Sequence, residues 1–130
     1  MGAQTTTTTV LGREAESAAL RFLERAGLVL LERNFRCRAG EIDLVMLDEA
    51  ASVLVLVEVR SRSRPDYGSA AATISFAKQR RCALAARYLY LKRRDLRRLP
   101  ARFDVIAIDP PSRAGGEPRI TWLRHAFPVD

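Results

Sequence analysis

The chain has few of the residues from which zinc sites and nucleophilic triads are built. Among its 130 residues are two cysteines, Cys37 and Cys82, and one histidine, His125, near the C-terminus. The cysteines have no Cys-x-x-Cys spacing and no clustered histidines, which argues against a zinc site. The same scarcity argues against a Ser-His-Asp or Cys-His nucleophile. Two reduced thiols are what we expect of a cytoplasmic protein.

Long apolar runs are also missing. No segment approaches the roughly 18 consecutive apolar residues of a membrane span, so we expect no membrane partner. The N-terminal residues, which include the threonines from Thr5 to Thr9, lack the basic and apolar regions of a signal peptide. We therefore expect residues 1–10 to be a flexible tail and residues 11–130 to form a single domain with one packed core.

Acidic residues are scarce relative to basic ones. Lysine and arginine number 22 against 15 aspartates and glutamates, which gives a formal net charge of +7 and a pI of about 10.4. Such a balance favours a polyanionic partner, with nucleic acid ahead of a membrane surface. Nine basic residues lie between Lys78 and Arg98, where the only acid is Asp95. The excess of arginine there favours phosphate contact, and the alternative is a solvated helix face that aids solubility.

Hydrophobic periodicity predicts an α/β fold with a mixed central sheet flanked by helices. Apolar residues recur at helical spacing in two segments, and short apolar runs bounded by turn-forming residues predict the strands. The second helix is predicted to present one apolar face made of Phe76, Ala83, Leu84, Tyr88 and Leu91. The predicted helices span residues 13–26 and 74–94, and the predicted strands span residues 28–38 (with a bulge), 40–47, 54–60, 102–108 and 119–123.

Three carboxylates lie inside two of these apolar strands. Residues two apart on a strand point to the same face, so Glu41 projects with Asp43, and Glu58 projects with Arg60. A hairpin loop over residues 49–52 would set Asp43 opposite Glu58 and Glu41 opposite Arg60. The other face of this strand pair is wholly apolar and contains Ile42, Leu44, Met46, Val53, Val55, Val57 and Val59.

Acidic side chains in a buried sheet are costly unless a cation meets them, so the cluster predicts a divalent-metal site. Carboxylate oxygens suit Mg²⁺ or Mn²⁺, and such a metal stabilises charge on a scissile phosphate. Together with a basic helix that holds a polyanion, these groups could form a phosphodiester hydrolase. The alternative is a strand pair with one solvated polar face, in which Glu58 and Arg60 form an ordinary ion pair.

The order of Asp43 and then Glu58-Val59-Arg60 resembles the Asp…(Asp/Glu)-x-Lys signature of the PD-(D/E)xK nuclease superfamily. More closely, the chain resembles the bacterial YraN-type family of uncharacterised endonuclease-like proteins, over almost its whole length. This resemblance implies a restriction-endonuclease-like core in the order α-β-β-β-α-β. The matching stretches include GEIDL at residues 40–44, VEVRSR at 57–62, KQRR at 78–81 and RFDV at 102–105.

The resemblance also implies roles for particular residues. Asp43 and Glu58 would be metal ligands, with the Val59 carbonyl as a third, and Glu16 on the first helix would reach the metal through water. Gln79 would lie near the site on the second helix, as a polar residue does in Holliday-junction-resolvase-like relatives. The alternatives are a surface acid favourable to the helix dipole for the first-helix glutamate and a plain surface amide for the glutamine.

Further positions are expected to support catalysis or binding. Glu41 is expected to be a partner of Arg60. Nucleic-acid contacts are expected from Arg62, Lys78, Arg80, Arg81 and Arg87.

Arg60 departs from the superfamily pattern, which has lysine there to orient or deprotonate the attacking water. Arginine stays protonated and cannot be a general base, although it can orient water or stabilise charge on phosphate. Two functions therefore stay open. One is a Mg²⁺- or Mn²⁺-dependent endonuclease acting on DNA, with branched repair or recombination substrates in view. The other is a nuclease-like protein that binds nucleic acid with weak or no turnover.

Partner expectations follow from the same reasoning. DNA is expected ahead of RNA, and the resolvase-like relatives add the expectation of a homodimer. A protein-interaction module whose basic helix meets an acidic partner is a third reading of the charge pattern.

Overall fold

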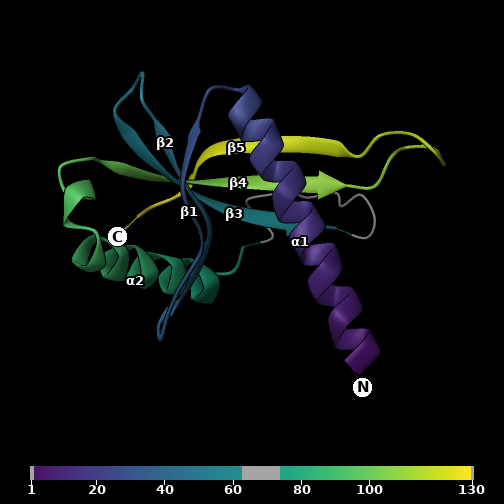
Figure 1. Cartoon of the computed structure of the whole chain (residues 1–130), viewed down its shortest axis with the longest axis horizontal. Coiled ribbons are helices and arrows are strands. Elements are labelled where there is room, and N and C mark those ends of the chain that lie inside the picture. Colours follow the sequence, from purple (N-terminus) through teal and green to yellow (C-terminus); the bar gives the residue numbers. More distant parts are fainter. Residues whose placement is uncertain (1, 63–73, 130) are drawn as a thin grey trace.

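A five-stranded sheet with a helix on each of its two sides forms the protein (Figure 1). The computed structural model describes residues 2–62 and 74–129, with side chains from residue 12 onward. The strands lie in sequence order across the sheet, with β3 parallel to β4 and the other neighbours antiparallel. In chain order the elements are α1 (Gly2–Arg25), β1 (Val29–Cys37), β2 (Gly40–Asp48), β3 (Val53–Ser61), α2 (Phe76–Lys92), the short 3₁₀ helix η2 (Arg94–Leu96), β4 (Ala101–Asp109) and β5 (Arg119–Phe127).

The two helices bury separate hydrophobic clusters against opposite faces of the sheet. On the α1 face, Ala19 and Leu23 pack with apolar residues of the central strands such as Val57 and Ile106. On the α2 face, Ala85 and Leu89 lie in a cluster with Leu54, Leu56 and Phe103. A mixed sheet between two helices confirms the predicted α/β fold class, and it is consistent with a restriction-endonuclease-like core.

The β2–β3 hairpin has the predicted register. Val45 pairs with Leu56 and Leu47 pairs with Leu54, and the loop covers residues 49–52. The ladder ends at the pair Leu44–Val57, so β2 separates from β3 before Asp43. Between Leu44 and Gly40 the side chains of β2 do not alternate between the two faces of the sheet as predicted.

Ile42 packs in the α2 cluster whereas Leu44 packs in the α1 cluster, so these two residues do not share a face as predicted. The reason is that β2 leaves β3 here while it stays paired with β1 as far as Gly40.

The buried face of α2 differs from the predicted one. Phe76, Leu84, Tyr88 and Leu91 are exposed, and the helix instead buries Cys82, Ala85, Ala86 and Leu89. Small residues let the helix lie close to the sheet, which bulky aromatic side chains would prevent. Close approach is also visible at the β1–β2 turn, where a Cβ added to Gly40 would lie 3.0 Å from the Arg81 carbonyl oxygen.

Helix α1 starts earlier than predicted, at Gly2 rather than at residue 13. The threonine tract predicted as a tail is therefore part of the helix. Residues 3–11 contain no glycine or proline, and threonine's modest helix propensity does not by itself end a helix. The C-terminal end is as predicted, because Gly27 follows with φ +99°.

Strand β5 is longer than predicted and is bulged opposite Asp104. The ladder joins Phe103 to Phe127 and Val105 to Leu123, so three residues of β5 face one residue of β4. Asp104 fills this bulge, and its carboxylate accepts a hydrogen bond from the His125 backbone N–H at 3.1 Å. In the described part of the chain, no helix has both the length and the apolar character needed to cross a bilayer.

Candidate active site

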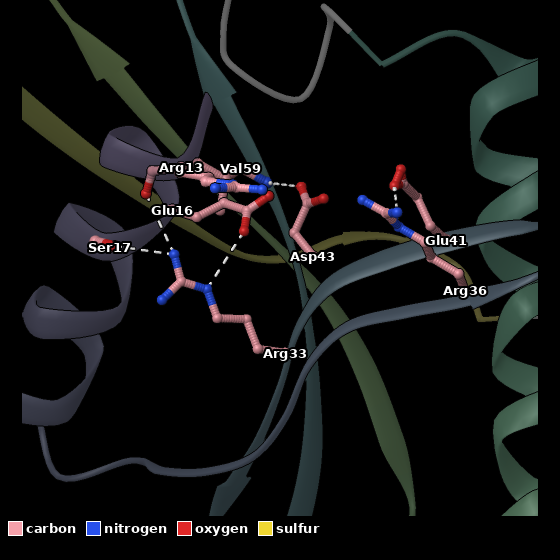
Figure 2. A network of polar contacts seen from close by, with 8 residues as sticks. All are labelled: Arg13, Glu16, Ser17, Arg33, Arg36, Glu41, Asp43 and Val59. Carbon is pink, nitrogen blue, oxygen red and sulfur yellow. Dashed lines mark hydrogen bonds and ion pairs between the residues drawn. The ribbon is translucent and has the colours of Figure 1, made fainter. Parts of the chain in front are cut away.

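Asp43 lies where β2 has just separated from β3. Its Oδ2 accepts a hydrogen bond of 2.8 Å from the backbone N–H of Val59, so the carboxylate takes the place of the next ladder bond. Figure 2 shows Asp43 between two other polar contacts. On the α1 side Glu16 meets Arg33, and on the α2 side Arg36 meets Glu41.

Glu58 is the most buried of the predicted site residues, with 5% of its surface exposed. Its Oε2 lies 3.4 Å from Nζ of Lys78, which projects from the first turn of α2. Its Oε1 is buried and has no hydrogen-bond partner within residues 2–62 and 74–129. A buried acceptor without a partner is rare and costly, and a carboxylate oxygen even more so. Glu58 Oε1 could therefore accept a further donor or a cation.

The two acids destabilise each other's ionised form. Burial first, and then the nearby Glu58 carboxylate, raise the pKa of Asp43 to about 7, with smaller contributions from Glu16 and Glu41 and opposition from the Val59 hydrogen bond. Burial also raises the pKa of Glu58, against the opposing charges of Lys78 and Arg60. Raised pKa values of two neighbouring carboxylates in a partly enclosed site are typical of functional sites.

A first hollow, of about 270 Å³, lies on the α1 side of Asp43. We call it the acidic hollow, and it is lined by Gly12, Arg13, Glu16, Asn34, Arg36, Glu41 and Asp43. Glu16 is fixed at its edge by Arg33, whose Nε lies 3.4 Å from Glu16 Oε1 and whose Nη2 also donates to Ser17 Oγ at 2.9 Å (Figure 2). Glu16 and Asp43 thus line one space, and the ion-pair partner of Glu16 is Arg33.

A second hollow, of about 320 Å³, lies on the other side of the Arg36–Glu41 pair. We call it the basic hollow, and it is lined by Arg36, Cys37, Gly40, Glu41, Lys78, Arg81 and Cys82. The pair joins Arg36 Nε to Glu41 Oε2 at 3.8 Å, so the predicted partnership of Glu41 with Arg60 is replaced by one with Arg36. An acidic and a basic hollow therefore adjoin, separated by one exposed ion pair.

Of the other predicted site residues, Arg60 acts on Glu58, whereas Gln79 and Arg62 contact residues outside the two hollows. Nε of Arg60 is buried and, among the described residues, has no hydrogen-bond partner, while its charge acts on Glu58. Gln79 donates from Nε2 to the Ile74 carbonyl at 3.1 Å and so supports the start of α2. Arg62 forms a two-pronged pair with Asp109, at 2.6 and 2.8 Å, which ties the end of β3 to the end of β4. The structure thus gives Gln79 and Arg62 local structural partners.

Comparison with known proteins places the chain in a family. The model of UPF0102, described as an uncharacterised protein family, matches residues 15–108. The chain belongs to the UPF0102 family. UPF0102 proteins similar to it include one from Dechloromonas aromatica, 49% identical over 124 residues (95% of this chain and 93% of the relative), and one from Alkalilimnicola ehrlichii, 52% identical over 116 residues (89% and 85%). A UPF0102 protein of Legionella pneumophila is 43% identical over 116 residues (89% and 92%). The predicted YraN-type membership is confirmed.

Two carboxylates, Asp43 and Glu58, form the centre of the candidate site. In the part of the chain that the structure describes, no group of three or more histidine, cysteine, aspartate or glutamate side chains is arranged to hold a metal ion. Asp43 and Glu58 would therefore need the Val59 carbonyl and water as further ligands. The unpartnered Oε1 of Glu58 and the hard oxygen character of this donor set fit Mg²⁺ or Mn²⁺, which retain several waters.

Lys78 is the site residue whose role the sequence did not reveal. It was predicted as a nucleic-acid contact from the basic composition of its segment, yet it lies against Glu58. No local pattern could have indicated this, because the contact depends on where α2, the helix that connects β3 to β4, lies against the sheet. The only local signal was the position of Lys78 in the first turn of α2, three residues after the N-cap Ser75.

Proposed function

We propose that this protein is a divalent-metal-dependent endonuclease that hydrolyses phosphodiester bonds in DNA. The observation that carries the proposal is the buried, unpartnered Oε1 of Glu58 beside Asp43, whose pKa is raised to about 7. In this assignment Asp43, Glu58 and the Val59 carbonyl hold Mg²⁺ or Mn²⁺. The ion would supply positive charge to a scissile phosphate and acidify water next to it.

The chain's own cations have distinct tasks in this proposal. Lys78 lies 3.4 Å from Glu58 and lines the basic hollow, so it would hold a phosphate oxygen next to the metal ligands. Arg36 and Arg81 line the same hollow and would bind the neighbouring phosphate of the strand. Arg60 would stabilise negative charge without accepting a proton, because a guanidinium stays protonated.

The test is a cleavage panel with purified protein and Mn²⁺ on duplex, single-stranded and four-way-junction DNA. We expect cleavage that EDTA stops and that Asp43→Asn and Glu58→Gln abolish. Glu49→Gln, which changes an exposed acid in the β2–β3 loop, is the matched control and should cleave as the wild type does. DNA that is bound but left intact under all these conditions contradicts the proposal.

A second candidate is a nuclease-like protein that binds nucleic acid without turnover. Arginine in place of the superfamily lysine at position 60 favours it, as does the absence of a third acidic or imidazole ligand among the described residues. Calorimetry separates the two functions. Mn²⁺ binding that Asp43→Asn removes supports the endonuclease, and no heat of metal binding by the wild type supports the binding protein.

The remaining assignments are proposals of the same kind. DNA is preferred to RNA, the location is cytoplasmic and the protein pairs as a homodimer. Analytical ultracentrifugation with and without DNA checks the last of these.

A further inference from the structure

A stripe of apolar and basic side chains on α2 faces away from the sheet. The residues Phe76, Arg80, Leu84, Arg87, Tyr88 and Leu91 recur at helical spacing and are exposed, and we call them the outer stripe. Phe76 is 83% exposed, Leu91 64% and Tyr88 47%. A hollow of about 560 Å³ runs along the first half of the stripe, between α2 and Pro128. So many exposed large apolar residues on one helix indicate a binding surface.

The charge of this surface indicates an anionic occupant. Arg80 and Arg87 lie within the stripe, and between residues 74 and 100 the only acid is Asp95. Asp95 is already bound by Arg93, through contacts of 3.0 and 3.1 Å. A second copy of the stripe would bring these arginines against their own equivalents, which like-charge repulsion disfavours. The occupant must therefore be negatively charged and must also have apolar surfaces.

Unpaired nucleotides have both properties. Their phosphates match Arg80 and Arg87, and their bases stack on aromatic rings such as those of Phe76 and Tyr88. In a duplex the base faces are hidden within the stack, so the exposed rings would gain little from it. The hollow along the stripe and the basic hollow lie on neighbouring faces of α2, because Arg80 lines the first and Arg81 lines the second. A strand that passes from the basic hollow around α2 would meet the stripe.

We infer that the outer stripe binds a short unpaired segment of DNA next to the bond that the active site cleaves. The substrate class is then DNA with a single-stranded part, such as a flap, an overhang or an open branch. The binding half of this inference stands by itself, and its link to cleavage rests on the proposed function.

The test measures binding of the full chain in EDTA, so that no metal or cleavage is involved. Fluorescence anisotropy compares a labelled single strand of about 20 nucleotides with a blunt duplex of the same length. Phe76→Leu and Tyr88→Leu keep apolar bulk but remove the ring, and each should weaken single-strand binding about five- to tenfold. Binding to the duplex should change less than about twofold. Tyr88→Phe keeps the ring and should bind as the wild type does.

Val29→Ala is the matched control, because Val29 is an exposed apolar residue on β1, outside the stripe. Unchanged single-strand affinity in both leucine variants overturns the inference, and so does an equal loss on single strand and duplex. An acidic peptide such as oligoglutamate, used as competitor, tests the rival occupant. If it displaces the oligonucleotide as effectively as an unlabelled strand of equal charge, the stripe recognises charge alone and the inference fails.

Failure of this inference differs from failure of the proposed function. Ring-dependent binding of single strands by a protein that cleaves nothing upholds the stripe and contradicts the endonuclease. Cleavage that is equal on blunt duplex and flap DNA, and unaffected by both leucine variants, upholds the endonuclease and contradicts the stripe.

Discussion

Two sets of acids lie in the same sheet, and their hydrogen-bond partners differ. The first is the buried Asp104 and Asp109, and the second is the buried Glu58 with the half-buried Asp43. Asp104 is completely buried, yet its carboxylate is surrounded by donors. Arg102 Nε lies 3.1 Å from one oxygen, and Trp122 Nε1 donates to the other at 2.8 Å. Glu58 on the adjacent strand β3 and Asp43 on β2 have fewer donors, and one Glu58 oxygen has none in the described chain.

The difference shows that burial of an acid does not by itself mark a functional site. The Arg62 guanidinium lowers the pKa of Asp109, which is the behaviour of a carboxylate held in a structural ion pair. In Asp43 and Glu58 the pKa is raised instead, by burial in both and by nearby carboxylates, which opposing contacts only partly offset. Acids with satisfied oxygens hold the fold together, and acids with an unsatisfied oxygen can accept a ligand.

The largest expected effect on stability comes from substitution of Asp104, whose two carboxylate oxygens both have donors. Asp104→Asn leaves Arg102 buried without its counter-charge and weakens the bulge in β5, so we expect the free energy of unfolding to fall by about 3 kcal/mol or more. Urea unfolding in EDTA at neutral pH measures this. The control Glu49→Gln should stay within about 0.5 kcal/mol of the wild type. A loss below about 1 kcal/mol for Asp104→Asn would show that the network contributes little.

The second-largest expected effect is the stabilisation by bound metal, which should depend on Asp43 and Glu58 and not on Asp109. At about 100 times its dissociation constant, Mn²⁺ should raise the free energy of unfolding of the wild type by about 2.7 kcal/mol. Asp43→Asn and Glu58→Gln should lose this increment, and Asp109→Asn, at the structural pair, should keep it. Thermal unfolding with and without Mn²⁺ provides the measurement. An increment that survives both site substitutions would place the ion elsewhere.

Removing the charge of Asp43 should stabilise the metal-free protein. The pKa of Asp43 is raised from 3.8 to about 7, so between these values the folded state binds the proton more tightly than the unfolded state. Stability from this residue is therefore fully present in acid and falls as the pH rises toward 7. Asp43→Asn should lack this fall and gain on the order of 2 kcal/mol at neutral pH. Urea unfolding in EDTA from pH 4 to 8 tests it, and a variant less stable than the wild type at every pH contradicts it.

The sequence could predict the hairpin because its register depends on local features. Strand parity and a loop over residues 49–52 were enough to pair Val45 with Leu56, as the structure confirms. The same reasoning could not tell how many donors each of Asp104 and Asp43 would have, because both acids lie within apolar strand runs. What separates them is the donors brought by β5, and these depend on a bulge that no local pattern indicated.

Tertiary packing also decided the features of α2 that were mispredicted. Large apolar residues were expected to face the sheet, but the close approach of α2 at Gly40 and Arg81 admits small ones. The contact of Lys78 with Glu58 likewise depends on where the crossover helix lies. The pairing of Arg62 with Asp109 also depends on tertiary packing, because it joins residues that are 47 positions apart.

The smallest expected effect compares two arginines at the end of β3, Arg60 within the strand and Arg62 just after it. Arg62 makes a two-pronged pair with Asp109, so Arg62→Lys should cost about 1–2 kcal/mol of unfolding free energy, because lysine cannot reproduce the planar fork. Nε of Arg60 has no hydrogen-bond partner in the described chain, so Arg60→Lys should change stability by less than about 0.5 kcal/mol. In the Mn²⁺ cleavage assay we expect the larger effect from Arg60→Lys and the smaller one from Arg62→Lys. Arg60→Lys should cleave faster than the wild type if the arginine limits turnover, whereas Arg62→Lys should cleave at the wild-type rate under conditions where it is folded. Equal stability losses in both variants would contradict the assignment of Arg62 to the fold and Arg60 to the site.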